Sequence, residues 1–183
     1  MRKPLIAASV LIMATGAAWA ENVATFAFIE ADPADRFVIK NVAPCPDVRL
    51  LEVSMDLSRA AARVFFDPEP GGPGYDDSRQ QFEYLEGGNY VTEITRLEDG
   101  GTALTMKLQD FGTGSILQFV LDVDDAGAAV EGAAEDVIGP ALEGAVIAAL
   151  IVNAQGEERA EAGALDARGT GSVSWEAVCE DPG

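Results

Sequence analysis

Turn-forming residues punctuate this chain at intervals of about eight to twelve residues, and this spacing limits the folds it can adopt. Between the turns lie short runs that alternate apolar and polar residues, the pattern of strands with one buried face. These runs are residues 22–30, 36–41, 49–57, 60–66, 81–85, 90–97, 102–109, 115–125, 145–153 and 172–178. Little of the chain has helical spacing. The sequence therefore predicts an all-β fold, an antiparallel β-sandwich of Ig-like or jelly-roll-like type with about nine or ten short strands.

The clearest strand is residues 115–125, S-I-L-Q-F-V-L-D-V-D-D. Period-two alternation places Phe119, Leu121 and Val123 on one face, and Val120, Asp122 and Asp124 on the other. Asp125 begins the following turn. Because several carboxylates gather where an apolar strand ends, this end needs a compensating cation or full exposure to water.

The first twenty residues have the features of a secretory signal peptide. Arg2 and Lys3 form a basic start, residues 5–14 are apolar, and Ala18-Trp19-Ala20 is a small-x-small cleavage site. The apolar run is too short to span a bilayer. We expect cleavage after Ala20, a single mature domain over residues 21–183, and a periplasmic or extracellular location.

The chain is strongly acidic, with 31 Asp and Glu against 12 Lys and Arg and a formal net charge of −19. Removal of Arg2 and Lys3 with the leader would bring the charge to −21. Nucleic acids and anionic membranes bind to basic surfaces, so both are poor partners for this protein. Divalent cations, basic proteins and neutral glycans remain compatible with this charge, and so does a simple role of the acidity in solubility.

Two cysteines are present, Cys45 and Cys179. In an oxidising compartment such a pair usually forms a disulfide, which here would join the two ends of the domain. The chain-entropy model assigns the closure of so long a loop about 4–5 kcal/mol. A redox-active pair is not favoured, because there is no C-x-x-C spacing and no histidine to activate a thiol.

The absence of histidine also removes Ser–His and Cys–His nucleophiles and most zinc sites. Carboxylate chemistry remains, and a calcium site is its first candidate, because Ca²⁺ takes about six to eight oxygen ligands. The predicted ligands lie at the ends of two predicted strands and are Asp122, Asp124, Asp125, Glu30, Asp32 and Asp35. The loop is not an EF-hand, because Ala133 stands where that motif has its last glutamate. The alternative is that these are two solvated acidic turns.

Two further kinds of site have weaker support. A pair of carboxylates could act as acid and base on a glycosidic bond, but a chain with so many acids provides such pairs by chance. A sugar-binding face could use the aromatic residues Phe65, Phe66, Tyr75, Tyr84, Tyr90 and Trp175. Aromatic residues at strand spacing usually belong to the core, with Tyr75, in a Gly-Pro loop, as the exception.

Several short motifs resemble those of small exported alphaproteobacterial proteins labelled "aggregation factor core". The motifs are F-I-E (28–30), D-R-F (35–37), Asn41, P-C-P (44–46), D-L-S (56–58), F-D (66–67) and F-x-L-D-V-D-D (119–125), together with Cys179. The resemblance covers roughly residues 26–125. It implies a secreted, non-enzymatic protein with an adhesive role that calcium assists.

Three hypotheses about function follow. The first is an exported binding or adhesion module, calcium-dependent and without catalytic residues, whose protein or glycan partner binds at a loop rim or sheet edge. The second is an envelope structural or inhibitor-like interaction protein that binds no ion. The third is a carboxylate-based glycoside hydrolase. The sequence leaves the partner, the ion and the oligomeric state open.

Overall fold

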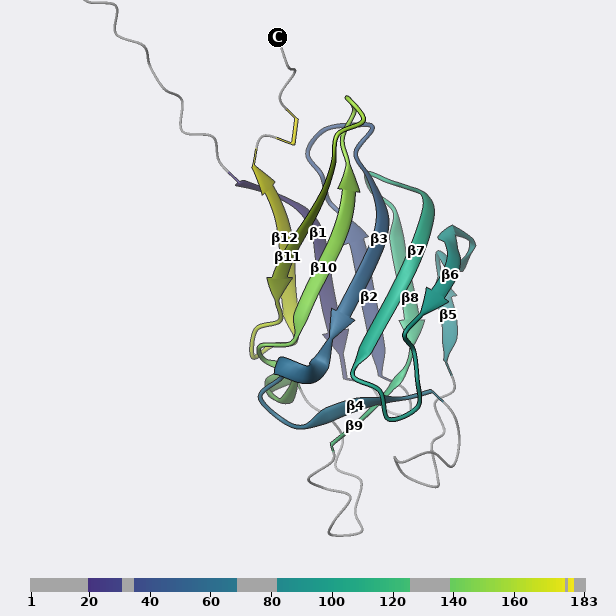
Figure 1. Ribbon diagram of the computed structural model, residues 1–183, viewed down its shortest axis with the longest axis vertical. Coiled ribbons are helices and arrows are strands. Elements are labelled where there is room, and N and C mark those ends of the chain that lie inside the picture. The colour runs from purple at the N-terminus through teal and green to yellow at the C-terminus, as the bar shows by residue number, and fades with distance from the viewer. Residues whose placement is uncertain (1–19, 31–34, 69–81, 126–138, 177, 180–183) are drawn as a thin grey trace, which may run out of the picture.

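The computed structural model describes residues 20–30, 35–68, 82–125, 139–176 and 178–179. This part of the chain is built from antiparallel strands and short 3₁₀ helices (Figure 1). The strands are β1 (Ala20–Ile29), β2 (Arg36–Asn41), β3 (Arg49–Asp56), β4 (Val64–Asp67), β5 (Glu83–Glu86), β6 (Val91–Thr95), β7 (Ala103–Gly112), β8 (Ile116–Val120), β9 (Asp122–Asp125), β10 (Val146–Val152), β11 (Glu158–Ala164) and β12 (Thr170–Glu176). The 3₁₀ helices are η1 (Leu57–Arg59), η2 (Gly88–Tyr90) and η4 (Gly139–Leu142).

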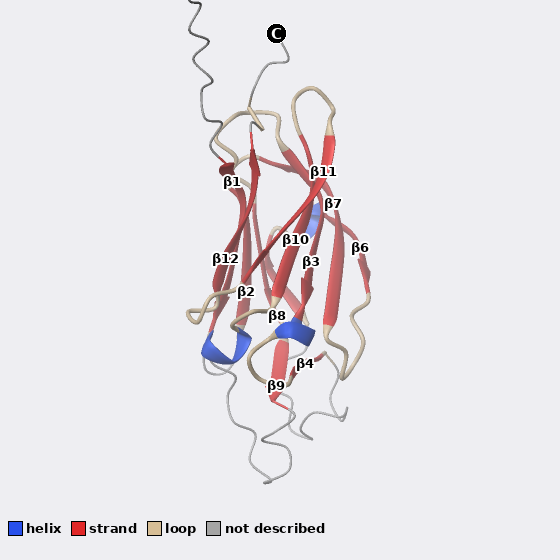
Figure 2. Cartoon of the chain, turned by 60° about the vertical axis from the view of Figure 1, so that its left-hand side comes forward, coloured by secondary structure: helices blue, strands red, loops and turns tan. Residues whose placement is uncertain are grey.

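Two five-stranded sheets face each other, which confirms the predicted β-sandwich. Sheet A has the order β12-β1-β2-β8-β5, and sheet B has the order β11-β10-β3-β7-β6. A two-stranded sheet of β4 and β9, here called the closing ribbon, lies across one end of the sandwich (Figures 1 and 2). The connection between β11 and β12 carries the chain from sheet B into sheet A.

The core fills the space between the two sheets with the inward residues that the alternation predicts. Phe37 is at its centre, with ring centroids 5.3 Å from Phe28 and 5.5 Å from Phe119. Phe66 of the closing ribbon lies 6.3 Å from the Phe37 ring and is fully buried. This contact anchors the ribbon to the main core.

The expected single strand over 115–125 is divided in the structure, and β11 forms in a stretch that the ten predicted runs do not include, so the described strands number twelve. β8 ends at Val120 in sheet A, and β9 begins at Asp122 in the closing ribbon. Val120 and Leu121 are both buried, so strict alternation fails at this point. After Val120 the chain leaves sheet A, and its next residues pair with β4 in the closing ribbon.

The predicted disulfide is present, with 5.7 Å between the Cα atoms of Cys45 and Cys179. It ties the loop between β2 and β3 to the residues that follow β12, at the end of the sandwich opposite the closing ribbon (Figure 1). Val178, beside the bridge, is buried. Of the predicted leader, residues 1–19 lie outside the described part of the chain, and Ala20 opens β1 opposite Glu176 of β12.

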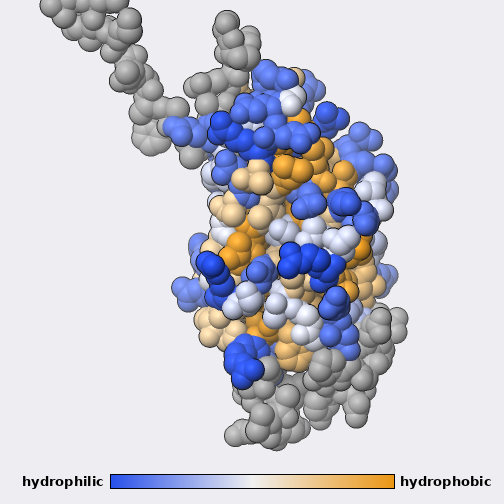
Figure 3. All heavy atoms as spheres, in the orientation of Figure 1, coloured by the Kyte–Doolittle hydropathy of each residue, from blue (hydrophilic) through white to orange (hydrophobic). Residues whose placement is uncertain are grey.

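The outer face of sheet B, toward the viewer in Figure 3, mixes hydrophobic and hydrophilic residues. One ion pair on it joins Lys107 of β7 to Glu93 of β6 at 2.6 Å. Such mixing is typical of an antiparallel sheet with one solvated face. Among the described residues, no helix has the length and apolar character needed to cross a bilayer.

Asn41, at the end of β2, is a buried polar residue that connects three segments. Its amide nitrogen donates to the carbonyls of Val48 (3.0 Å) and Phe111 (3.1 Å). Its side-chain oxygen accepts from the backbone nitrogen of Ala43 at 3.1 Å. These bonds fix the path of the chain where β2 leaves the sheet.

Replacing Asn41 by Ala is expected to lower the free energy of unfolding by about 2–3 kcal/mol, because it leaves buried backbone groups without partners. Urea denaturation measures this loss. Asn22→Ala is the matched control, since the Asn22 side chain is exposed and, within the described part of the chain, accepts one hydrogen bond, from Ser174. The control should stay within about 0.5 kcal/mol of wild type. Equal losses in the two variants would contradict the assigned role of Asn41.

Candidate functional site

The closing ribbon places carboxylates on one of its two faces. β4 and β9 pair with Phe66 opposite Val123 and Asp67 opposite Asp122. Phe66 and Val123 are buried against the core. The alternation of side chains therefore turns Asp67, Asp122 and Asp124 to the ribbon's other face.

Asp67 is the unusual member of this set, because its side chain is completely buried, with 0% exposure. Neither of its carboxylate oxygens has a hydrogen-bond partner among the residues that the structure describes. Burying an unpaired carboxylate is costly, and proteins normally offset the cost with a donor, a cation or a bound proton. Because no described residue donates to Asp67, a cation or a proton is left to offset the cost.

A second carboxylate approaches Asp67 from the turn between β6 and β7. Hydrogen bonds from the Phe66 nitrogen to the Gly101 carbonyl (2.8 Å) and from the Gly100 nitrogen to the Phe66 carbonyl (2.9 Å) hold this turn against β4. Asp99 belongs to the same turn, and its Oδ1 is also buried without a hydrogen-bond partner. The turn thus adds an acid on the far side of β4 from β9.

Burial is the largest of the effects that raise the pKa of Asp67 from 3.8 to about 7, and the neighbouring Asp99 and Asp124 carboxyl groups raise it further. Ionised carboxylates only accept hydrogen bonds, so these neighbours can bond to Asp67 only when a proton is present. Without a metal, Asp67 therefore holds a proton up to near-neutral pH. A cation at the same place would take over the proton's role.

Asp67, Asp122 and Asp124 form the aspartate group, in which one carboxylate oxygen from each residue lies within 4.8 Å of the others. This arrangement of hard oxygen donors suits Ca²⁺ or Mg²⁺. It does not suit zinc, because the chain has no histidine and both cysteines are in the disulfide. The group can hold one divalent ion and leave positions for water or another ligand.

Comparisons of the chain with models of protein families, with curated proteins and with solved structures find no match. The resemblance to the aggregation factor core proteins therefore stays a prediction. The function of this chain has to be argued from its own geometry.

The structure brings together two of the six predicted ligands, Asp122 and Asp124. Asp125 follows them at the end of β9, opposite Val64. Glu30 is exposed after β1, and Asp35 is buried just before β2; neither belongs to the aspartate group. Asp32 lies outside the described residues. Coordination by Glu30, Asp32, Asp35 and Asp125 stays a prediction.

Asp67 and Asp99 are the residues that the sequence reasoning missed. Asp67 lies just beyond the predicted strand 60–66 and directly follows the apolar pair Phe65-Phe66. An acid that ends a buried strand was the available signal. Asp99 lies in a Gly-rich turn, and no local pattern indicates which strand such a turn will contact.

Most of the aromatic residues considered for a sugar-binding face belong to the core or pack against it. Phe66 and Trp175 are buried. Tyr90 packs edge-on against Phe111 with 5.2 Å between ring centroids, and Tyr84 packs similarly against Phe82 at 4.8 Å. Tyr75 lies outside the described residues. These four residues therefore form no stacking platform for sugars, and Phe65, half-buried opposite Asp124, is a single ring.

Proposed function

We propose that this protein is an exported, non-enzymatic binding module in which a calcium ion braces one end of a β-sandwich. Asp67, Asp122 and Asp124 hold the ion, and Asp99 adds negative charge beside it. The ion joins β4 to β9 and so fixes the closing ribbon, next to which a protein or glycan partner binds. Adhesion between cells is the form of binding that the family resemblance favours.

One observation carries this proposal: Asp67 is fully buried, receives no hydrogen bond from any described residue, and faces two further carboxylates. A cross-strand pair of acids is destabilising without compensation, because like charges directly opposite each other repel. A divalent ion between them turns the repulsion into a link between two strands. Asp67, whose ionised carboxylate is costly to bury in the metal-free protein, would then help to stabilise the loaded ribbon.

Calcium is favoured over magnesium by the surroundings that the leader and the disulfide indicate. Extracellular calcium modules bind with dissociation constants of about 10⁻⁴–10⁻³ M, which suits a compartment rich in calcium. Magnesium requires near-ideal octahedral geometry and keeps most of its water. A group of three side chains, one of them fully buried, fits the more flexible coordination of calcium better.

Calcium is expected to raise the melting temperature of the protein after treatment with a chelator. At ten times the dissociation constant the gain in unfolding free energy is about 1.4 kcal/mol, a shift of about 4 °C for a domain of this size. Asp122→Asn and Asp124→Asn should each reduce the shift by more than half. Differential scanning calorimetry in chelator, Ca²⁺ and Mg²⁺ measures it.

Asp110→Asn is the matched control, because it removes one exposed carboxylate from β7 outside the aspartate group. Asparagine also tolerates the positive φ of 54° at this position. The control should keep the full calcium shift. A wild-type protein whose melting temperature is the same in chelator and in millimolar Ca²⁺ would remove the metal from the proposed function.

A further inference from the structure

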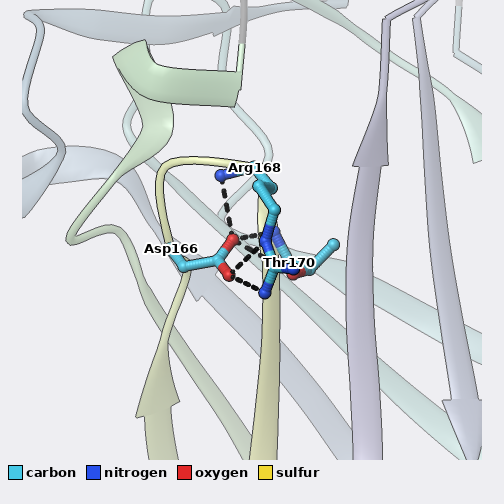
Figure 4. A network of polar contacts seen from close by, with 3 residues as sticks. All are labelled: Asp166, Arg168 and Thr170. Carbon is cyan, nitrogen blue, oxygen red and sulfur yellow. Dashed lines mark hydrogen bonds and ion pairs between the residues drawn. The ribbon is translucent and has the colours of Figure 1, made fainter.

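A rigid polar turn stands at the edge of sheet A, between β11 and β12. The carboxylate of Asp166 accepts five hydrogen bonds, from the backbone nitrogens of Arg168 and Thr170, the Thr170 hydroxyl, and Nε and Nη2 of Arg168 (Figure 4). The Arg168 guanidinium and then the Thr170 backbone hold the pKa of Asp166 well below its usual range. The turn is also tied to β1, because the Phe28 nitrogen donates to the Gly169 carbonyl at 2.8 Å.

This network fixes the Arg168 guanidinium while leaving it open to solvent. The Arg168 side chain is 83% exposed although two of its N–H groups are bonded to Asp166. A guanidinium carries five N–H donors in a planar fork, so most of them remain available to a ligand. Because the turn already holds the side chain in place, a ligand would lose little additional side-chain entropy on binding.

Next to this turn, the outer face of sheet A has a hollow of about 430 Å³, here called the sheet A hollow. Ala27 and Val38, which pair across β1 and β2, give it an apolar floor. One step along the strands, Lys40 pairs with Thr25, which in turn pairs with Ser172. The hollow thus joins an apolar floor to hydroxyl groups and to two cations, Lys40 and Arg168.

The charge around the sheet A hollow is opposite in sign to that of the whole protein. Among the described residues that line it, Lys40 and Arg168 are cations and Asp166 is the single acid, a local balance of +1 in a chain of net charge −19. Lys40 forms no ion pair with any described residue. At physiological ionic strength charges beyond about 8 Å are screened, so the local sign decides what binds here.

We propose that the sheet A hollow binds an acidic sugar, a uronate unit of a polysaccharide chain. Arg168 and Lys40 bind the carboxylate, Thr25 and Ser172 exchange hydrogen bonds with the ring hydroxyls, and the ring lies over Ala27 and Val38. A simple inorganic anion would leave the apolar floor and the hydroxyls unused. The hollow shares no residue with the aspartate group, so this inference extends the proposed function without depending on bound calcium.

The test uses the full mature protein in chelator, with a galacturonate hexamer as the probe and its fully methyl-esterified form as the neutral counterpart. Isothermal titration calorimetry should show binding of the acidic hexamer about tenfold tighter than that of the ester. Lys40→Gln and Arg168→Gln should each weaken acidic-hexamer binding roughly tenfold. Chelator prevents calcium from cross-linking the probe and separates this result from the metal test.

Lys107→Gln is the control, because it removes a cation from the outer face of sheet B. It should leave affinity within about twofold of wild type. Since Arg168→Gln also alters the turn, the melting temperature of each variant is measured alongside, and Lys40→Gln tests the site where the turn is intact. The proposal is overturned by absence of binding, by equal affinity for acid and ester, or by equal losses in Lys40→Gln and Lys107→Gln.

Discussion

In chelator at pH 8, the Asp67→Asn variant is expected to melt as much as about 10 °C above the wild-type protein. The wild-type fold must then keep a charged carboxylate in a fully buried position without a donor. The interval between its ordinary pKa of 3.8 and the folded value of about 7 corresponds to about 4 kcal/mol of destabilisation. Asparagine fits the same space, carries no charge and can donate to the neighbouring carboxylates.

The Asp67 carboxyl also sets how the stability of the metal-free protein depends on pH. Between about pH 4 and pH 7 the folded state keeps the Asp67 proton that the unfolded state releases. The free energy of unfolding therefore falls as the pH rises through this window and becomes level above it. The difference in unfolding free energy between wild type and Asp67→Asn should be smallest near pH 4 and reach its maximum at about pH 8.

Calcium should reverse this order of stabilities. The ion stabilises the wild-type protein through Asp67, whereas the variant has lost the central ligand and should gain little from calcium. Asp110→Asn, outside the group, should behave as wild type in both conditions. If Asp67→Asn is instead the less stable protein in chelator at pH 8, the ionised carboxylate is already stabilised by another group, and the assigned role of Asp67 is wrong.

The sandwich could be predicted from sequence because its cause is local. Turn residues and alternating apolar positions recur along the chain, and each strand carries its own signal. The division of 115–125 could not be predicted in this way. It depends on the pairing of β9 with β4 in the closing ribbon, which the pattern within 115–125 does not indicate. Sheet order and register likewise depend on contacts between segments distant in the chain.

Only the part of the candidate site that depends on local sequence could be predicted. Asp122 and Asp124 stand at the end of a recognisable strand, so their shared face followed from alternation. The start of β2 lies beside the end of β8, since Arg36 pairs with Val120, but neither Glu30 nor Asp35 belongs to the aspartate group, so their coordination of a metal stays a prediction. However, the carboxylate that completes the group comes from β4, and the pairing of Asp67 with Asp122 is a long-range contact. No local rule predicts that two acids will face each other across strands.

Removing the disulfide is expected to cause the largest loss of stability. The Cys45→Ser/Cys179→Ser protein should unfold with a free energy about 4–5 kcal/mol lower than wild type, because the bridge closes a loop of 134 residues in the unfolded chain. The folded state should keep its sheets, since β12 is paired with β1 along its length and Trp175 is buried. The loss therefore arises mainly in the unfolded state.

Urea denaturation distinguishes this account from a merely local role of the bridge. A more expanded unfolded chain exposes more surface, so the double variant should have a steeper dependence of unfolding free energy on urea as well as a lower midpoint. Wild-type protein in a reducing agent should match it. If both midpoints equal that of the oxidised protein, the bridge fixes only the residues after β12, around Val178. The stability of the sandwich would then come from the core and, at the opposite end, from the closing ribbon.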